Sequence, residues 1–252
     1  MITELSIVIP ALNEADYLPR LLKSIAAQKD YKGKLEVIVV DGKSEDDTVA
    51  VARSFKDKVP GLKVIEAKQR NVGYQRNRGG EAAQYSYLLF LDADTMLPEG
   101  ALARWAKHTR LSTPFVAVAL HRADHMNALD MCFLVVGYFL CLVAFICRVP
   151  MVNGDWILTT KENFERVSGF VEGALLGEDA DFGIRSIKAG AAYRFYMNPP
   201  ITGSDRRVRE LGHAKMMLLW ARGFIHVRKH GPIFPNEGFE YPFGHYQKAK
   251  KD

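Results

Sequence analysis

Short apolar runs alternate with amphipathic segments through the first hundred of the 252 residues. Runs rich in branched and aromatic residues predict strands buried on both faces of a sheet at residues 5–9, 35–40, 62–66 and 87–91. Segments with apolar residues on one helical face predict helices at 14–28, 46–56 and 72–84. Strands and helices that alternate in this way predict βαβ units, and therefore an α/β fold built on one doubly wound, Rossmann-like sheet.

The residues that follow these strands are the first place to look for function, because ligands of such sheets bind beyond the carboxyl ends of the strands. They are Pro10, Ala11, Asn13 and Glu14 after the first strand, Asp41 after the second, and Asp92, Ala93 and Asp94 after the fourth. No G-x-G-x-x-G or G-x-x-x-x-G-K-[ST] motif occurs, so dinucleotide and P-loop classes lose their usual support. Acidic and amide groups can bond a base and a ribose but repel a diphosphate, so a cation is expected between them.

Asp92 and Asp94 carry the candidate metal chemistry. Mg²⁺ and Mn²⁺ prefer oxygen ligands and are commonly held by one or two carboxylates together with substrate phosphates. Two carboxylates on one side of an extended backbone therefore predict a site for a divalent metal that stabilises a phosphate leaving group. The alternative for this short D-A-D-T string is a turn or a helix N-cap.

Composition narrows the class of partner. The net charge of +5 and the pI of about 9.0 suit anionic partners such as nucleotide phosphates or a membrane surface, but fall short of the basic stripe of a nucleic-acid binder. Cys132, Cys141 and Cys147 show neither a disulfide framework nor metal spacing, which predicts reduced thiols in a cytosolic chain. The N-terminal residues do not resemble a signal peptide.

Six motifs taken together resemble glycosyltransferase family 2 over about residues 5–210. In order they are IVIPALNE, VIVVDGKSEDDT, NVGYQRNRGGEAA, LLFLDADT, VNGDW at 152–156 and GEDADFGIR at 177–185. The resemblance implies the glycosyltransferase A fold with a mixed sheet. It also implies an inverting enzyme that uses a nucleotide-diphospho-sugar and a divalent metal, Mn²⁺ or Mg²⁺.

The resemblance assigns roles to individual residues. It implies that Asp94 holds the metal, with Asp92 contributing directly or through the ribose. The residues implied to bind the nucleotide-sugar are Pro10, Ala11, Asn13, Glu14, Asp41, Gly73, Arg76, Asn77, Asp92, Ala93, Asp155, Trp156, Arg206 and Arg207. The next turn matches the family at Ser44, Asp47 and Thr48, where an N-capping role is favoured.

Several of these assignments have an open alternative. Arg76 fits a diphosphate or ribose contact, against a solvated helix N-terminus. Arg206 and Arg207 fit a clamp on the diphosphate or on an anionic acceptor, against a basic helix surface. Asp155 and Trp156 lie where relatives line the sugar and acceptor pocket, but a buried tryptophan that packs the core is the plain interpretation of Trp156.

Glu178 and Asp179 supply the second chemical requirement, a general base within hydrogen-bond reach of the acceptor. The resemblance makes Asp179 the base, with Glu178 and Asp181 as near alternatives. Acidic residues at a helix start are also favoured by the helix dipole alone, so capping is the alternative. An acceptor that is itself a phosphate is already anionic and needs no base.

The stretch 131–147, within an expected apolar helix at 128–148, has no charged residue. Its helix would reach about 25 Å, short of a hydrocarbon core of about 30 Å. A single crossing would also place DADT and GEDAD on opposite sides of the bilayer. We therefore expect a helix in the membrane interface or re-entrant, with a buried core or a dimer contact as alternatives. Residues 213–230 read as an amphipathic helix suited to anionic lipid, against an ordinary core helix.

These observations predict a catalytic domain at 1–212 and a membrane-associating helix and tail at 213–252. The expected activity moves a sugar to a lipid-linked acceptor, such as a polyprenyl phosphate or a glycolipid, by a peripheral or monotopic protein at the cytoplasmic face of the membrane. Two other classes remain open: a sugar-phosphate nucleotidyltransferase, which releases pyrophosphate, and a non-catalytic nucleotide-sugar binder at the membrane.

Overall fold

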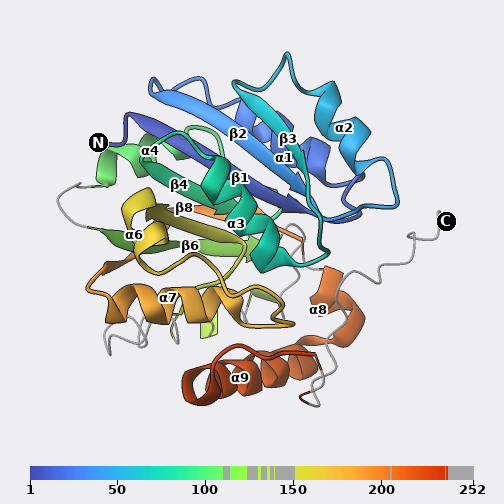
Figure 1. The fold of residues 1–252 in the computed structure, drawn as a ribbon, viewed down its shortest axis with the longest axis vertical. Helices are drawn as coiled ribbons and strands as arrows, with labels where there is room; N and C mark the ends of the chain where they lie inside the picture. Colours follow the sequence, from blue (N-terminus) through green and yellow to red (C-terminus); the bar gives the residue numbers. More distant parts are fainter. Residues whose placement is uncertain are drawn as a thin grey trace.

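The computed structural model describes residues 1–109, 114–123, 130–131, 135–136, 139, 151–204, 206–235 and 237. One eight-stranded sheet lies between two layers of helices (Figure 1). Its strands are β1 (Glu4–Ala11), β2 (Lys34–Asp41), β3 (Leu62–Glu66), β4 (Tyr87–Leu91), β5 (Thr95–Met96), β6 (Phe115–Ala123), β7 (Trp156–Thr160) and β8 (Ala192–Gly203). The described helices are α1 (Leu18–Ala26), α2 (Thr48–Ser54), α3 (Val72–Ala82), α4 (Ala101–His108), α6 (Lys161–Arg166), α7 (Glu178–Lys188), α8 (Arg206–Leu211) and α9 (His213–His230).

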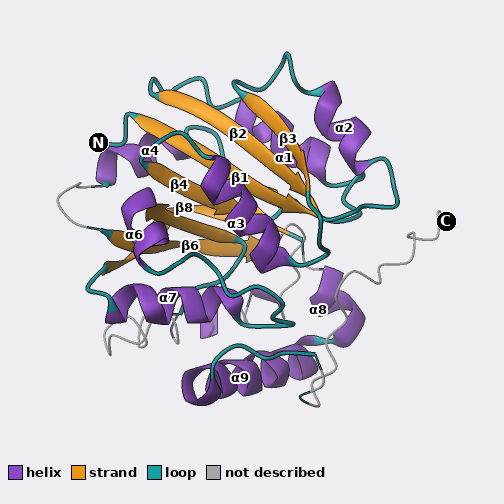
Figure 2. Cartoon of the chain, viewed as in Figure 1, coloured by secondary structure: helices purple, strands orange, loops and turns teal. Residues whose placement is uncertain are grey.

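The strand order is β3-β2-β1-β4-β7-β6-β8-β5. The neighbouring strands β3, β2, β1 and β4 run parallel to one another. Strand β7 is antiparallel to both of its neighbours, β4 and β6, so the sheet is mixed. Helices cover both faces of this sheet (Figure 2). The predicted α/β fold with a doubly wound mixed sheet is therefore confirmed.

The first helix begins later than the sequence pattern suggests, at Leu18 instead of residue 14. Asn13 has a left-handed backbone with φ of 55°, which does not belong to a right-handed helix. Pro19 occupies the first turn, where its missing N–H leaves no helical bond unmade. The residues between β1 and α1 are consequently left as a loop at the carboxyl edge of the sheet.

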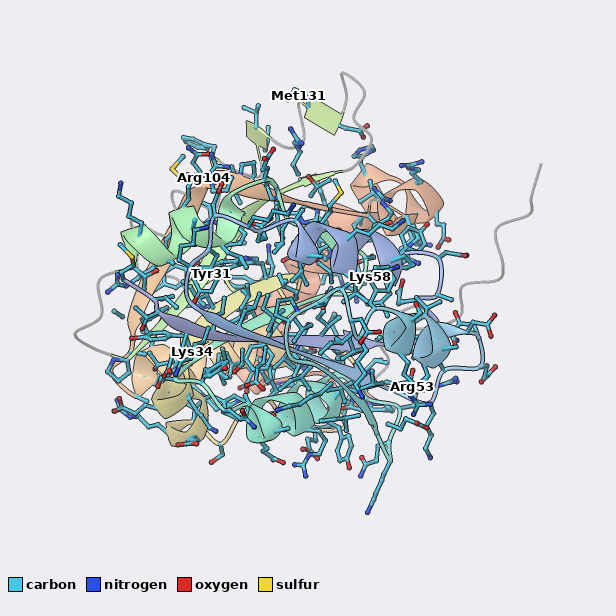
Figure 3. All side chains as sticks on the ribbon, turned by 90° about the horizontal axis from the view of Figure 1, so that it is seen from above. Tyr31, Lys34, Arg53, Lys58, Arg104 and Met131 are labelled. Atoms are coloured by element: carbon cyan, nitrogen blue, oxygen red, sulfur yellow. The ribbon has the colours of Figure 1, made fainter. Side chains whose placement is uncertain are left out.

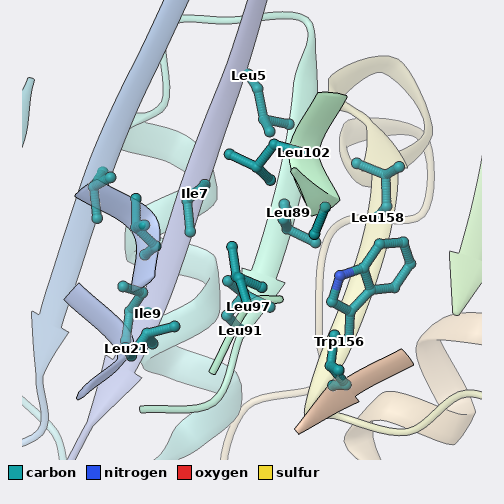
Figure 4. Packing of buried hydrophobic residues seen from close by; sticks show 14 of the residues in the cluster. Leu5, Ile7, Ile9, Leu21, Leu89, Leu91, Leu97, Leu102, Trp156 and Leu158 are labelled. Atoms are coloured by element: carbon teal, nitrogen blue, oxygen red, sulfur yellow. The ribbon is translucent and has the colours of Figure 1, made fainter. Parts of the chain in front are cut away.

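Alternation along β1 divides the core into two layers, because successive side chains of a strand point to opposite faces. Ile7 and Ile9 pack toward α1 and α4, whereas Val8 packs toward α3, α6 and α7. Figure 4 shows the first layer, in which leucines from β1, β4, β7 and α4 surround the ring of Trp156. Trp156 is fully buried and contacts the rings of Trp105 and Tyr196.

The predicted helix at 213–230 is present as α9, which lies along α7 (Figure 1). The side chain of Val227 packs directly on Gly177, and Leu176 packs on Gly223. Within the described ranges, no helix is long and apolar enough to cross a membrane. The three cysteines and most of the apolar stretch 131–147 lie outside the described residues.

Candidate functional site

The carboxyl ends of β1, β2 and β4 meet at one edge of the sheet. Ala11, the last residue of β1, pairs with Asp41, the last residue of β2. Gln75 of α3 ties these two strand ends together, because its Nε2 donates to the carbonyl oxygens of Ala11 and Val40. The polar residues that follow the three strands are therefore neighbours, as predicted from their positions in the sequence.

Asp41 presents an unusual acceptor at this edge. Its side chain is buried, and Oδ2 accepts hydrogen bonds from the backbone N–H groups of Lys43 and Ser44 at 3.0 and 3.1 Å. The second oxygen, Oδ1, is buried without a partner among the described residues. An unpaired buried acceptor costs free energy, so the arrangement suits a ligand that donates an N–H to it.

The loops after β1 and β2 are joined by hydrogen bonds between their own polar groups. The N–H of Asn13 donates to the Ser44 hydroxyl at 2.9 Å, and the N–H of Glu14 donates to the Thr48 hydroxyl at 2.8 Å. Asn13 Oδ1 in turn accepts from a backbone N–H of the second loop. Ser44 and Thr48 are therefore structural here, while the Asn13 oxygen expected to face the nucleoside is occupied within the protein.

The capping of α2 differs in one detail from the sequence interpretation. Asp47 makes no side-chain cap hydrogen bond. Asp46 instead accepts from the N–H of Thr48 at 3.0 Å. The apolar members of the predicted set, Pro10, Ala11 and Ala93, are buried and can offer a ligand only backbone atoms.

Asp94 is joined to Glu14 by Arg206 of α8. One guanidinium nitrogen of Arg206 lies 2.9 Å from Asp94 Oδ2 and 3.0 Å from Glu14 Oε1. The guanidinium also stacks over the ring of Tyr17, 4.0 Å from its centroid. Burial raises the pKa of Glu14 to about 7, with Arg206 opposing the rise and Asp94 adding to it.

Asp92 is joined to Glu178 by Arg76, whose side chain is 2% exposed. The guanidinium donates to Asp92 Oδ1 at 2.9 Å, to Glu178 Oε1 at 2.7 Å and to the carbonyl oxygen of Gly154 at 3.0 Å. Burial opposes the charge of Arg76, but the two carboxylates outweigh it and raise its pKa. This placement revises the expected role. Arg76 is a buried cation that binds two acidic segments, and it is too buried to contact a diphosphate.

The other residues of α3 that were expected to bind the nucleotide-sugar also make their contacts within the protein. A Cβ at Gly73 would collide with the carbonyl oxygen of Val171, so the glycine permits close packing. The side chain of Asn77 accepts from the N–H of Phe170 at 2.8 Å and donates to its carbonyl oxygen at 2.9 Å. Gly73 and Asn77 thus hold the chain before α7 in place, instead of facing a ligand.

Asp179 begins α7 beside this cluster. Its side chain points toward Gly154, since a Cβ on that glycine would lie 3.2 Å from Asp179 Oδ2. Burial raises the pKa of Asp179 to about 7, the neighbouring Glu178 adds to the rise, and Arg76 opposes it. A carboxylate that exchanges its proton near neutral pH has the property that general-base catalysis requires.

His121 and Asp155 form a pair that the motifs did not reveal. His121 closes the apolar run of β6, and its Nδ1 is hydrogen-bonded to Asp155 Oδ2. Burial disfavours the imidazolium, but Asp155, with smaller contributions from Asp94 and Asp92, raises the pKa of His121. The available signal was a polar residue directly after the apolar run at 115–120, which is the pattern used to select the polar residues after the other strands.

The predicted metal ligands do not share one enclosed cage. Within the described part of the chain, no group of three or more His, Cys, Asp or Glu side chains is placed to hold a metal. Asp94 uses Oδ2 for Arg206, which leaves its other carboxylate oxygen as a hard donor for an ion. A single carboxylate completed by substrate phosphates is a common Mg²⁺ arrangement, so the residues fit a divalent ion that arrives with a diphosphate.

Two predicted residues remain to be placed. Arg207 lies on α8, and its side chain is outside the described part of the protein. Trp156 is the core residue of the plain interpretation, because none of its surface is exposed to a sugar or an acceptor. Its neighbour Asp155 stays at the site, where its backbone oxygen accepts from the N–H of Asp92.

Comparison with known proteins identifies relatives in sequence and in fold. Residues 6–126 match the family model described as Glycosyl transferase family 2. Over 90 residues the chain is 38% identical to Glycosyltransferase AglE of Haloferax volcanii, a stretch covering 35% of this chain and 30% of AglE. The chain therefore corresponds to less than a third of that relative.

Two solved structures share the fold at lower identity. The mannosyltransferase PcManGT of Pyrobaculum calidifontis, solved with GDP-Man and Mn²⁺, is 20% identical with a TM-score of 0.65, over 87% of this chain and 64% of that one. Glucosyl-3-phosphoglycerate synthase of Mycobacterium tuberculosis, solved with Mn²⁺, UDP and phosphoglyceric acid, is 20% identical with a TM-score of 0.64, over 94% and 81%.

Proposed function

We propose, because this chain belongs to glycosyltransferase family 2, that it transfers a sugar with inversion from a nucleotide-diphospho-sugar to a lipid-linked acceptor at a membrane surface. The family and the enzyme class expected from the sequence motifs are confirmed by the family match. The donor, the acceptor and the membrane are the parts that we propose.

The observation that carries this proposal is the contact made by Arg76. Its guanidinium joins Asp92, after β4, to Glu178, at the start of α7, although these residues lie 86 positions apart in the chain. The two segments that carry the proposed metal ligand and the proposed base therefore meet at Arg76. Had the two acidic segments been far apart, no single reaction centre could have used both.

The donor is proposed to bind across the strand ends. The unpaired Oδ1 of Asp41 would accept an N–H from the base. The sugar would then extend toward Asp92 and the His121–Asp155 pair, where two charged segments offer hydrogen-bond partners for hydroxyl groups. Arg206, which bridges Glu14 and Asp94, would supply positive charge for the diphosphate.

Asp94 is the residue proposed to hold Mn²⁺ or Mg²⁺, which two of the neighbouring structures support because they contain Mn²⁺. The ion, when bound, neutralises charge on the departing diphosphate. Asp179 is proposed to take the proton from an acceptor hydroxyl, for which its pKa of about 7 is suited. Glu178 and Arg76 orient the start of α7 around it.

The exposed face of α9 supports the proposed membrane surface. Its apolar members are Met217, Leu218, Trp220 and Ile225, exposed by 38%, 60%, 54% and 54%. The same helix carries four exposed cationic side chains, Lys215, Arg222, Arg228 and Lys229, and no acidic residue. Apolar side chains flanked by cations are what an amphipathic helix needs to lie on an anionic bilayer.

The apolar stretch 131–147 supports the same surface at the few positions that are described. Met131, Val135, Val136 and Phe139 are spaced to share one helical face and are exposed by 50%, 59%, 45% and 65%. Figure 3 shows Met131 at the outer edge of the protein. Asp130 Oδ1 lies 2.5 Å from Nε2 of His213, the first residue of α9, so the two apolar faces begin side by side.

We accordingly propose that residues 1–212 form the catalytic domain and that residues 213–252, together with the apolar stretch, attach it to the cytoplasmic face of a membrane. A polyprenyl phosphate or a glycolipid would then meet the site from the bilayer. This choice of acceptor follows from the exposed apolar surface.

The donor is tested by thermal-shift screening against UDP-, GDP- and dTDP-sugars with and without Mn²⁺. One donor class should raise the melting temperature in a metal-dependent way, and Asp94→Asn should remove the rise. The matched control is Asp57→Asn, at an exposed position after α2. Turnover should release a nucleoside diphosphate, whereas release of pyrophosphate would identify a nucleotidyltransferase instead.

Membrane attachment is tested separately by sedimentation with vesicles of neutral and of anionic lipid. The protein should sediment with anionic vesicles, and Leu218→Glu or Ile225→Glu should release it. Ser54→Glu on α2, which lies at the opposite end of the protein from α9 (Figure 1), should leave binding unchanged. Equal binding by all three variants would contradict the proposed surface.

A further inference from the structure

Arg206 is bound to Asp94, the carboxylate that is proposed to hold the metal ion. Its guanidinium is held by Asp94 on one side and by both oxygens of Glu14 on the other, at 3.0 and 3.3 Å. The ring of Tyr17 covers one face of the guanidinium. The side chains of Arg206, Glu14 and Asp94 are only 18%, 14% and 21% exposed, so this is a partly buried charge cluster and not a surface ion pair.

Three different parts of the chain build this cluster. Glu14 and Tyr17 come from the loop and turn between β1 and α1, Asp94 from the turn after β4, and Arg206 from the first residue of α8. A guanidinium is charged at every physiological pH, so Arg206 is a cation here. The two carboxylates thus already have a counter-charge in the protein without ligand.

We propose that Arg206 is the resting counter-cation of Asp94 and that a divalent ion and Arg206 exclude one another on this carboxylate. The inference rests on the proposed function and adds an order of binding to it. A metal ion alone binds poorly, because the guanidinium held on Asp94 Oδ2 repels a second cation at the other oxygen of the same carboxylate. A metal ion accompanied by a diphosphate binds well, because the diphosphate gives Arg206 a new anionic partner.

Charge counting explains why the two cations do not coexist without a diphosphate. Arg206 and a dication together would place three positive charges against the two carboxylates Asp94 and Glu14. A diphosphate adds negative charge and planar pairs of oxygens, which a guanidinium binds in a bidentate manner. Arg206 is therefore a positioning residue that couples metal binding to donor binding.

This role differs from that of Arg76, the other arginine of the site. Arg76 is fully buried among Asp92, Glu178 and the Gly154 carbonyl, so it has no room to exchange partners. Arg206 sits at the start of the six-residue helix α8 and keeps part of its surface exposed. Only Arg206 can therefore exchange its carboxylate partners for a diphosphate when a ligand binds.

The test measures Mn²⁺ binding directly, by electron paramagnetic resonance of free Mn²⁺ in titrations of the protein, with no nucleotide and then with saturating UDP or GDP. For the wild-type protein, the nucleotide that stabilises it should tighten Mn²⁺ binding. Arg206→Gln should tighten Mn²⁺ binding to the nucleotide-free protein by about tenfold, which corresponds to about 1.4 kcal/mol. Arg206→Gln should also reduce the factor by which the nucleotide increases the affinity for Mn²⁺.

Three further variants make the result specific. Arg209→Gln, an exposed arginine of the same helix, should leave both affinities at their wild-type values. Arg206→Lys keeps the charge and should keep Mn²⁺ binding weak in the absence of nucleotide. Asp94→Asn combined with Arg206→Gln should abolish the tighter site. Melting temperatures of all variants establish that each one is folded.

The outcomes separate this inference from the function on which it rests. If wild-type protein binds Mn²⁺ with a nucleotide but Arg206→Gln leaves nucleotide-free Mn²⁺ affinity unchanged or weaker, the exclusion is wrong and the glycosyltransferase proposal stands. If no nucleotide promotes Mn²⁺ binding to the wild-type protein, both the proposed metal site and the exclusion fall.

Discussion

The buried arginine at position 76 gives the sharpest test of how the site is built. Replacement of Arg76 by methionine keeps a long, flexible side chain but removes the guanidinium that contacts Asp92, Glu178 and the Gly154 carbonyl at 2.7–3.0 Å. The Glu178 side chain is 8% exposed and would be left buried with no cation. Removing one partner of a buried pair costs about 3–5 kcal/mol, because the remaining charge stays desolvated.

We expect Arg76→Met to lower the free energy of unfolding by about this amount, and the melting temperature by about 6–20 °C for a chain of this size. Urea titration followed by tryptophan fluorescence is a suitable assay, since Trp105 and Trp156 are buried and in contact. Because Arg76 opposes the raised pKa of Asp179, the variant should also shift that pKa above about 7.

Two comparisons isolate the cause. Arg78→Met, on the same helix but with a side chain 38% exposed, should cost no more than about 1 kcal/mol, the usual value for a surface pair. Glu178→Gln in the Arg76→Met background should recover part of the lost unfolding free energy, because it removes the buried carboxylate charge that has no cation beside it. A loss below about 1 kcal/mol for Arg76→Met would refute the reasoning that this arginine neutralises the buried acids.

Two other predictions concern titrating groups of the site. Burial raises the pKa of Asp179 from 3.8 to about 7, so the folded protein holds a proton that the unfolded chain releases. That stabilisation is complete below about pH 4 and is lost as the pH rises through 7. Asp179→Asn should therefore flatten the fall in unfolding free energy over this pH range. An unchanged slope would contradict a raised pKa for Asp179. The second concerns Asp155→Asn, which removes the carboxylate beside His121 and should lower the pKa of that histidine, measured by NMR titration of the imidazole; a pKa equal to the wild-type value would show that Asp155 does not hold the imidazolium.

The four strands β1 to β4 and the helices between them were predictable from local pattern, whereas β5 to β8 were not predicted. The runs predicted at 62–66 and 87–91 coincide with β3 and β4, and the amphipathic segment at 213–230 coincides with α9. Such patterns work because burial on a sheet or along a helix repeats at a fixed spacing within one segment. The start of α1 was the exception, since the loop conformation at Asn13 depends on hydrogen bonds to the loop after β2.

The positions of side chains at the site were predictable only where the end of a strand or helix fixes them. Asp41, Asp94 and Asp179 lie at the strand and helix ends where their order along the chain places them. Arg76 and Trp156 were assigned to ligands by resemblance, yet both are buried inside the protein. His121 was not singled out, because its partner Asp155 lies 34 positions further along the chain.

By itself, the sequence determined the order of strands and helices over the first hundred residues, the mixed acidic and basic character of the strand ends, and the presence of two strongly apolar segments, since each of these is a property of neighbouring residues. Only the tertiary structure decided which cation neutralises which acid. Arg76 lies 102 positions from Glu178, and Arg206 lies 192 positions from Glu14. Charges so far apart in the chain acquire partners only when the sheet brings the ends of its strands together and removes water from between them.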